Sequence, residues 1–342
     1  MKAPGVPAAD FLRALDLFSG LTDDELGELA ATALPFEAPA GATLFRQGDE
    51  ASDMYCMAEG TARVSVRLAG EEELEVARLG PGSVVGEMAL VDESVRSASV
   101  RVVDAARGYR IERWSFDILR AAFRPSSYKV VHRLAELVSA RLRAATQELL
   151  DGSGPSLMMA AEGDPPERID RTPAPDGREG ALDPDDLAPL PFFRGFTRAE
   201  MGELLTHLRR IDVPRRRLVF DQGDAADAAY VVLRGAVESR GSVPSGALKL
   251  ALHGPGTVFG AEALFRPERR ATRAVTREDT KLVQLDAERF QRLHREGAVV
   301  AYKLCDAATR LLVDALRGAN RRRTWLVASG LGLDGVSTPE SS

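Results

Sequence analysis

A short run of residues near position 90 combines side chains that can bind a phosphate ester with a neighbouring hydroxyl. The run reads Gly86-Glu87-Met88-Ala89-Leu90 and is followed by Arg96-Ser97-Ala98. Arg96 offers a planar fork that bonds two phosphate oxygens at once, which a lysine cannot match in geometry. An ionised Glu87 only accepts hydrogen bonds and therefore suits a hydroxyl donor. Gly86 lets the backbone approach closely, Ser97 adds a hydroxyl and Ala98 leaves room.

No comparable set of residues suggests catalysis or metal binding. The four histidines, His132, His207, His253 and His294, are scattered without an HxxxH pair or a neighbouring carboxylate that would suggest a triad. Cys56 and Cys305 are far apart and belong to no CxxC motif, which disfavours zinc and a disulfide. We therefore expect no catalytic residues, no metal ligands and no cofactor, and a protein that is not an enzyme.

The surroundings of this run occur twice in the chain. FRQGDEASDMYCMAEG (45–60) matches FDQGDAADAAYVVLRG (220–235) at an offset of 175. LGPGSVVGEMALVDESVRSASV (79–100) matches HGPGTVFGAEALFRPERRATRA (253–274) at an offset of 174. A one-residue deletion in the intervening hairpin explains the change, because loops tolerate deletions. The chain is a duplicated domain.

Each block is predicted to be a set of short antiparallel strands framed by helices. Residues 61–68 alternate apolar and polar side chains, and residues 248–252 do the same in the second block. Paired glycines mark the following turns, and many short strands with glycine turns favour a jelly roll. Helices are expected at 22–32 and 197–209 in front and at 127–150 and 298–317 behind. The first opens with the capping-box pattern Thr22-Asp23-Asp24-Glu25.

The two long helices, 127–150 and 298–317, have apolar stripes wider than one barrel needs. We expect them to pack against each other, within one chain or between two chains of a homodimer. The alternative, in which each helix covers only its own barrel, stays open.

Residues 151–186 predict a flexible linker, because they hold six prolines, five glycines and ten acidic side chains against three arginines. The expected organisation is a tail (1–10), a first domain (11–150), this linker, a second domain (187–326) and a tail (327–342). The fold class is α+β, with two tandem antiparallel jelly rolls.

Composition limits the partners of the chain. Its 342 residues have a net charge of -6, which disfavours nucleic acid as the main partner. Neither a signal peptide nor an apolar run of roughly 18 residues is present, so we expect a cytoplasmic protein away from membranes. The residues after Trp325 leave no room for a helix-turn-helix module, so direct DNA binding is not expected.

GEMAL with RSA downstream closely resembles the phosphate-binding cassette of the cyclic-nucleotide-binding domain family. That family includes the catabolite activator proteins and the regulatory subunits of cyclic-AMP-dependent kinase. The resemblance covers roughly residues 11–150 and 187–326, including the RQGD and DQGD turns. It implies that Arg96 and the backbone at Gly86 and Glu87 hold the ring phosphate, and that the Glu87 carboxylate binds the ribose hydroxyl. It also implies that Met88, Ala89, Ser97 and Ala98 line the site and that Thr146, assigned only by its helix position, contacts the base; an exposed threonine is the alternative.

The second block departs from this pattern. Ala261 stands in place of Glu87 and Ala271 in place of Ser97, while Arg270 is retained. Glu262 lies one position later, about 100° around a helix. Two interpretations stay open: an altered anion site, for another nucleotide or a cyclic dinucleotide, or a degenerate domain kept for packing or partner contact. The residues of the altered site would be Gly260, Glu262, Ala263, Arg270 and Ala271.

These observations favour a receptor that binds cyclic AMP or cyclic GMP in the first block. It would signal through the helix 127–150 to the second block or to an unidentified protein partner. The alternative is a ligand-independent interaction scaffold, in which Arg96 and Glu87 merely pair with each other. Ser97 suits either base, so both nucleotides are candidates.

Overall fold

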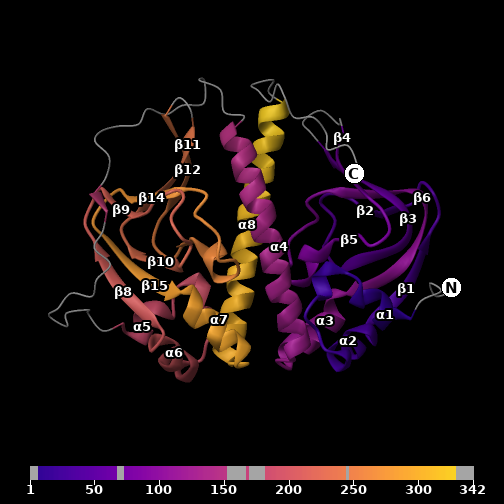
Figure 1. The fold of residues 1–342 in the computed structure, drawn as a ribbon, viewed down its shortest axis with the longest axis horizontal. Coiled ribbons are helices and arrows are strands. Elements are labelled where there is room, and N and C mark those ends of the chain that lie inside the picture. The colour runs from indigo at the N-terminus through magenta and orange to yellow at the C-terminus, as the bar shows by residue number, and fades with distance from the viewer. Residues whose placement is uncertain (1–6, 68–72, 152–166, 169–181, 244–245, 329–342) are drawn as a thin grey trace. The chain divides into compact units, whose positions relative to one another are not determined.

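The computed structural model describes residues 7–67, 73–151, 167–168, 182–243 and 246–328. The chain divides into two compact units, Met1–Leu137 and Val138–Ser342. Each unit combines β-strands with helices before and after them (Figure 1). The predicted α+β class, with two tandem strand-rich domains framed by helices, is confirmed.

The first unit begins with short helices that lead into its barrel. These are α1 (Ala8–Arg13), a 3₁₀ turn η1 (Asp16–Phe18) and α2 (Asp23–Ala30). The predicted capping box is present: Glu25 N donates to Thr22 Oγ1, and Thr22 N donates to Glu25 Oε2 at 2.8 Å. The helix ends at Ala30 rather than at residue 32, because β1 already begins at Ala33.

Two long strands organise the first barrel. β6 (Ser99–Glu112) pairs with β1 (Ala33–Ala38), β2 (Thr43–Phe45) and β3 (Asp53–Arg67). β3 also pairs with β4 (Glu73–Leu79) and β5 (Val84–Val85). β6 pairs with both β1 and β2, so this one strand joins the two faces of the barrel around an apolar interior. That interior is formed by Phe36, Ala38, Met57, Ala62, Val100, Val102 and Ala106.

Two helices follow the first barrel, α3 (Arg113–Ala121) and α4 (Pro125–Asp151). The latter confirms the predicted helix 127–150. The boundary between the compact units falls inside α4, so Val138–Asp151 is grouped with the second unit. The sequence-based boundary at 150 assigned the whole helix to the first domain.

The second unit repeats the arrangement. α5 (Pro184–Leu187), η4 (Pro191–Phe193) and α6 (Arg198–Leu205) precede the strands, and α7 (Ala287–Arg295) and α8 (Val299–Ala328) follow them. One sheet has the order β13-β10-β15-β8 and the other β12-β11-β14-β9-β7. The strands are β7 (Glu167–Arg168), β8 (Leu208–Val213), β9 (Arg217–Phe220), β10 (Ala228–Arg234), β11 (Val237–Val243), β12 (Gly246–His253), β13 (Val258–Phe259), β14 (Arg273–Thr276) and β15 (Thr280–Asp286).

Several sequence-based details are wrong. The helix predicted at 197–209 ends at Leu205, since Leu208 and Arg209 belong to β8 and pair with β15. The alternation predicted over 248–252 is interrupted: Leu252 is 54% exposed, and the β11–β12 register shifts between Ser239 and Arg240. Most of the predicted linker lies outside the described residues, but Glu167–Arg168 forms a short strand parallel to β9.

Candidate functional site

The cassette of the first unit begins at a glycine that the structure requires. β5 ends at Gly86, whose φ is +78°, and a 3₁₀ turn η2 (Glu87–Leu90) follows. A Cβ at position 86 would lie 2.6 Å from Nη1 of Arg96 and 3.0 Å from the Asp53 carbonyl oxygen. Both the left-handed backbone and the close approach therefore demand glycine.

Arg96 is buried, with 5% of its surface exposed, in direct contact with this turn. Its Nη2 donates to Asp53 Oδ1 at 2.6 Å, and Nη1 lies 3.4 Å from the Gly86 carbonyl oxygen. The guanidinium stacks on Phe45 with its carbon 4.0 Å from the ring centre. Burial lowers the pKa of Arg96, and the negative charge of Asp53 opposes that shift. Nε of Arg96 has no hydrogen-bond partner among the described residues, so one donor is available to an anion.

Glu87 is the first residue of the turn η2. Glu87 is 5% exposed, and it acts on Cys56 of β3: burial and then the charge of Glu87 raise the pKa of the Cys56 thiol. The structure places Arg96 against Gly86, and the buried Glu87 follows Gly86 directly in the chain; their joint role in binding stays a prediction. Ala89 is buried, Met88 and Ala98 are partly buried, and Ser97 is exposed at the edge of the cassette. Thr146 is partly buried on the half of α4 that belongs to the second unit, and its assignment to the base stays a prediction.

Three residues of the site escaped the sequence analysis. Asp53 is the carboxylate on Arg96, Phe45 is the ring beneath it, and Tyr55 donates its hydroxyl to Asp53 Oδ2 at 3.1 Å. A signal was present for Phe45, since it recurs as Phe220 in the repeated block and Arg270 stacks there at 4.1 Å. Asp53 and Tyr55 lie on the same face of β3, because side chains alternate along a strand.

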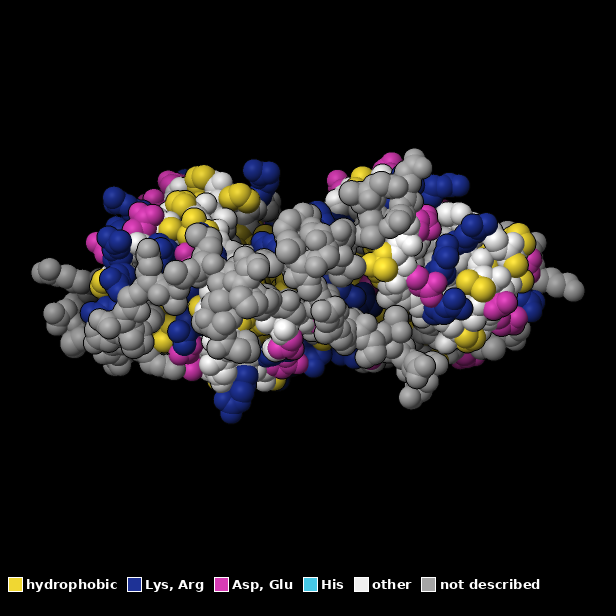
Figure 2. Space-filling view, turned by 90° about the horizontal axis from the view of Figure 1, so that it is seen from above, with side chains coloured by type: hydrophobic (Ala, Val, Ile, Leu, Met, Phe, Trp, Pro, Cys, Tyr) yellow, Lys and Arg dark blue, Asp and Glu magenta, His cyan; other side chains and the backbone are white. Residues whose placement is uncertain are grey.

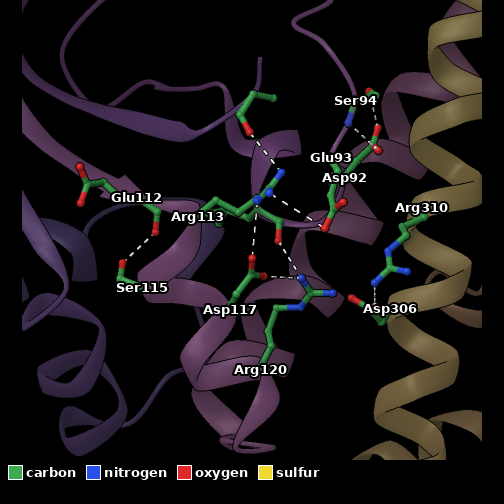
Figure 3. Close-up of polar contacts among 12 residues, drawn as sticks. Asp92, Glu93, Ser94, Glu112, Arg113, Ser115, Asp117, Arg120, Asp306 and Arg310 are labelled. Atoms are coloured by element: carbon green, nitrogen blue, oxygen red, sulfur yellow. Dashed lines mark hydrogen bonds and ion pairs between the residues drawn. The ribbon is translucent and has the colours of Figure 1, made fainter. Parts of the chain in front are cut away.

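The end of the cassette is tied to α3 by charged side chains (Figure 3). Nη1 of Arg120 donates to the Leu90 carbonyl oxygen at 3.2 Å and to Asp117 Oδ1 at 2.8 Å. Arg113 lies 3.5 Å from Asp117 and 4.0 Å from Glu93, measured between the nearest nitrogen and oxygen atoms. These contacts connect the cassette and the loop after it to α3.

The cassette of the second unit has the same backbone but a different charge arrangement. Gly260 has a φ of +71° and precedes the turn η5 (Ala261–Leu264). The Arg270 side chain is fully buried and donates from Nη1 to the Gly260 carbonyl oxygen and to Glu262 Oε1, each at 3.2 Å. Glu262 thus neutralises the arginine instead of taking the position of Glu87, where Ala261 is buried.

Aromatic side chains fill the second barrel. Phe220, Tyr230 and Phe259 all belong to its buried core cluster, and the Tyr230 and Phe259 rings stack 5.2 Å apart. His253 stacks on Phe259 at the same distance. In the first barrel the corresponding Phe45, Tyr55 and Val85 are only partly buried. The first barrel therefore has accessible lining where the second is packed.

Three arginines of the basic loop of the second block have polar partners among the described residues. Arg266 pairs with Glu268 at 2.6 Å, Arg273 pairs with Asp221 at 2.9 Å, and Arg269 donates to the Gly223 carbonyl oxygen at 2.8 Å. Figure 2 shows basic and acidic side chains next to one another on the face it displays. Both interpretations of this cassette, an altered anion site and a degenerate domain, stay predictions.

A hollow of about 530 Å³ opens in the first unit beside β1 and β2. Its described lining includes Phe36, Leu44, Tyr55 and Arg110, and the residues 86–98 of the cassette are not part of it. Tyr55 connects the hollow to the site through its hydrogen bond with Asp53.

The described residues hold few further candidates for a functional site. They contain no group of three or more His, Cys, Asp or Glu arranged to hold a metal ion. Cys56 and Cys305 are both buried free thiols. None of the helices in this part of the chain is long and apolar enough to cross a membrane.

The fold and the site define a protein with two jelly-roll domains, each with a glycine-arginine phosphate cassette. The family model of the cyclic nucleotide-binding domain matches residues 35–122 and 210–296, together just over half of the sequence. The chain belongs to this family.

The curated relatives match less than half of the chain. The cyclic AMP receptor protein of Thermus thermophilus is 34% identical over 139 residues, which is 40% of this chain and 62% of the relative. The acetyltransferase Pat of Mycolicibacterium smegmatis is 34% identical over 114 residues, 33% of this chain and 34% of the relative. The chain thus spans less than two thirds of the length of either curated relative. The solved regulatory domain of Toxoplasma gondii PKA with cAMP has 21% identity and a TM-score of 0.32, covering 86% of this chain and 92% of that one.

Proposed function

We propose that the protein is a cyclic nucleotide receptor that binds one ligand per chain, in its first domain. The observation that carries this proposal is a cassette in which the buried Arg96 contacts Gly86 and the buried Glu87 follows that glycine, in a barrel whose lining stays partly exposed. The arginine supplies bonds to the ring phosphate and the carboxylate accepts from the ribose hydroxyl. A ligand without that hydroxyl leaves a buried carboxylate unpaired, which costs binding energy.

Cyclic AMP is the proposed ligand, with cyclic GMP as the competitor to test. The Thermus relative is named for cyclic AMP and matches 34% of the aligned residues. Ser97 lies at the exposed edge of the cassette and suits either base.

The second domain is proposed to be a regulatory module without its own ligand. Its arginine is neutralised by Glu262, its ribose carboxylate is absent and its barrel is filled by Phe259 and its neighbours. The second half of α4 docks within this unit: Arg143 Nε lies 2.6 Å from Glu268 Oε2, next to the second cassette. We propose that ligand-driven movement of the first cassette passes through α3 and α4 to that contact.

The proposed receptor passes its signal to a protein partner. It does so without catalysis, direct DNA binding or membrane insertion. A cytoplasmic location and dimerisation through α4 or α8 remain part of the proposal. A ligand shifts such an equilibrium only by its different affinity for the two helix positions.

Calorimetric titration of the purified chain with cyclic AMP, and separately with cyclic GMP, tests the proposal. Arg96→Lys keeps the charge but loses the fork, so we expect binding to weaken about tenfold or more. Arg101→Ala is the matched control, because Arg101 is exposed on β6 outside the cassette. One site per chain that responds to Arg96→Lys supports the proposal. Absence of heat and of a thermal shift with both nucleotides contradicts it.

One observation favours a second candidate, the ligand-independent scaffold. Arg96 already has a carboxylate partner, Asp53, at 2.6 Å, so the first cassette is held together without a ligand. The same titration decides between the candidates: a scaffold binds neither nucleotide yet melts at a higher temperature than Arg96→Lys.

A further inference from the structure

The carboxylate of Asp53 is shared between the cassette and the neighbouring strand. Oδ1 accepts from Arg96 Nη2 at 2.6 Å. Oδ2 accepts from the Tyr55 hydroxyl at 3.1 Å and from Arg110 Nη1 at 3.4 Å. Asp53 is buried, so each of its oxygens requires a partner. One oxygen serves the arginine of the site and the other serves residues outside the cassette.

Strand pairing places Arg110 in this position. Tyr55 on β3 lies opposite Arg110 on β6, and Asp53 lies opposite Glu112. Residues two apart on one strand share a face of the sheet. Arg110 and Glu112 on β6 therefore lie on the same face as their partners Tyr55 and Asp53 on β3. Nη2 of Arg110 also lies 2.9 Å from Glu112 Oε1. The Arg110 side chain is 35% exposed and lines the hollow beside β1.

An incoming phosphate competes with Asp53 for Arg96. If Asp53 had no other cation, loosening its bond to Arg96 would leave a buried carboxylate poorly paired. Because Arg110 and Tyr55 hold Oδ2, Asp53 keeps charged and neutral donors while Arg96 turns toward the ligand. The Asp53 carboxylate therefore has a second cationic partner, Arg110, before its bond to Arg96 weakens.

The second domain offers an internal comparison. Equivalent strand pairs place Ala228 where the first barrel has Asp53 and Gln284 where it has Arg110. Gln284 donates to Asp286 and has no carboxylate of the Asp53 type to hold. In the second domain Asp227, one residue before Ala228, lies 3.7 Å from Arg270, and the position of Arg110 holds the uncharged Gln284, so a second cation is missing at that position.

We infer that Arg110 is a positioning residue for nucleotide binding: it holds Asp53 and thereby frees Arg96 for the phosphate. This inference rests on the proposed function. It predicts that Arg110 acts on affinity only through Asp53, although it touches neither Arg96 nor the proposed ligand position.

A double-mutant cycle in the full-length chain tests the inference, with cyclic AMP titrated by calorimetry. Arg110→Gln should weaken binding about 5- to 20-fold, the loss of roughly one charged hydrogen bond. Arg110→Lys should recover most of the affinity, since the charge returns. In the Asp53→Asn background, Arg110→Gln should change affinity less than about twofold, because the carboxylate it acts on is gone. Thermal melting of every variant checks that the barrel is folded.

Two other results would overturn the inference. If Arg110→Gln binds like the unaltered chain, Arg110 has no positioning role. If it loses the same affinity in both backgrounds, it acts by general electrostatics or by barrel stability and not through Asp53. An unaltered chain that binds no nucleotide is a different failure, which removes the proposed function and this inference with it.

Discussion

Nη1 of Arg270 lies 3.2 Å from Oε1 of Glu262, so the second domain supplies its own anion to its cassette arginine. The first domain has no such glutamate: Met88 stands at the corresponding position, and the buried Glu87 precedes it. Two cassettes with the same backbone therefore differ in the position of their glutamate, which moves by one residue. The barrel interiors reinforce this difference, since Phe259 is 4% exposed and Val85 is only partly buried.

Replacing residues of the second cassette by those of the first should show that the aromatic side chains of the second barrel prevent nucleotide binding there. Ala261→Glu with Glu262→Met restores the carboxylate register, yet we expect binding to stay at one nucleotide per chain because Phe259 still occupies the barrel. Adding Phe259→Val should raise the stoichiometry toward two. Calorimetric stoichiometry checks both steps, and a second site in the double variant would show that packing is not the barrier.

Gly86→Ala should abolish tight binding and destabilise the first domain. The φ of +78° and a Cβ 2.6 Å from Arg96 Nη1 impose both strain and a clash. We expect a cost of about 1–3 kcal/mol in unfolding free energy and at least a tenfold weaker affinity for cyclic AMP. Gly80→Ala is the matched control, because a Cβ there meets nothing within 4 Å. Urea denaturation and titration measure the two effects, and equal behaviour of the two variants would contradict the geometry.

Glu87→Gln should remove discrimination for the ribose hydroxyl. In the proposed complex the buried carboxylate accepts from that hydroxyl, so the unaltered chain should prefer cyclic AMP over its 2′-deoxy analogue about tenfold or more. An amide still accepts, but it loses the charge that strengthens the bond. Competition binding with the two ligands gives the ratio. Glu50→Gln, an exposed glutamate outside the 3₁₀ turn, should leave the ratio unchanged.

Burial of His253 should make the second domain acid-sensitive. Burial lowers the pKa of His253 from 6.5 to about 4, and its Nε2 lies 2.8 Å from Ser239 Oγ. Between those pH values the unfolded chain binds a proton that the folded chain does not. The free energy of unfolding should therefore fall as the pH drops from 6.5 toward 4, by up to about 3 kcal/mol.

The first block provides the variant that tests this pH dependence. It has Val64 and Leu79 at the corresponding positions, so Ser239→Val with His253→Leu is a natural replacement. Denaturation of the second domain at several pH values should show a smaller slope in this double variant. Ser239→Val alone keeps the histidine and should keep the slope; an unchanged slope in the double variant would assign the acid sensitivity to other groups.

The repeat and the cassette were predictable because they depend on local sequence. A glycine with positive φ, a short turn and an arginine ten residues later lie within one continuous segment, so the motif could be read from the sequence, and the structure places Arg96 against Gly86. The capping box at Thr22 and the helix 127–150 were predictable for the same reason.

The partners of Arg96 were not predictable from spacing. Asp53 is 43 residues from Arg96 and 57 residues from Arg110 along the chain. The β3–β6 register brings Asp53 and Arg110 together. The register shift that exposes Leu252 is equally non-local, because it depends on pairing with β11.

The sequence by itself determined that this protein is a duplicated cyclic nucleotide-binding fold with one complete cassette and one altered cassette. Only the tertiary structure decided that Glu262 turns onto Arg270, that aromatic rings close the second barrel and that Asp53 divides its oxygens between two arginines. The physical reason is that charge pairing and packing depend on distances across the barrel, which strand register sets and residue spacing along the chain does not.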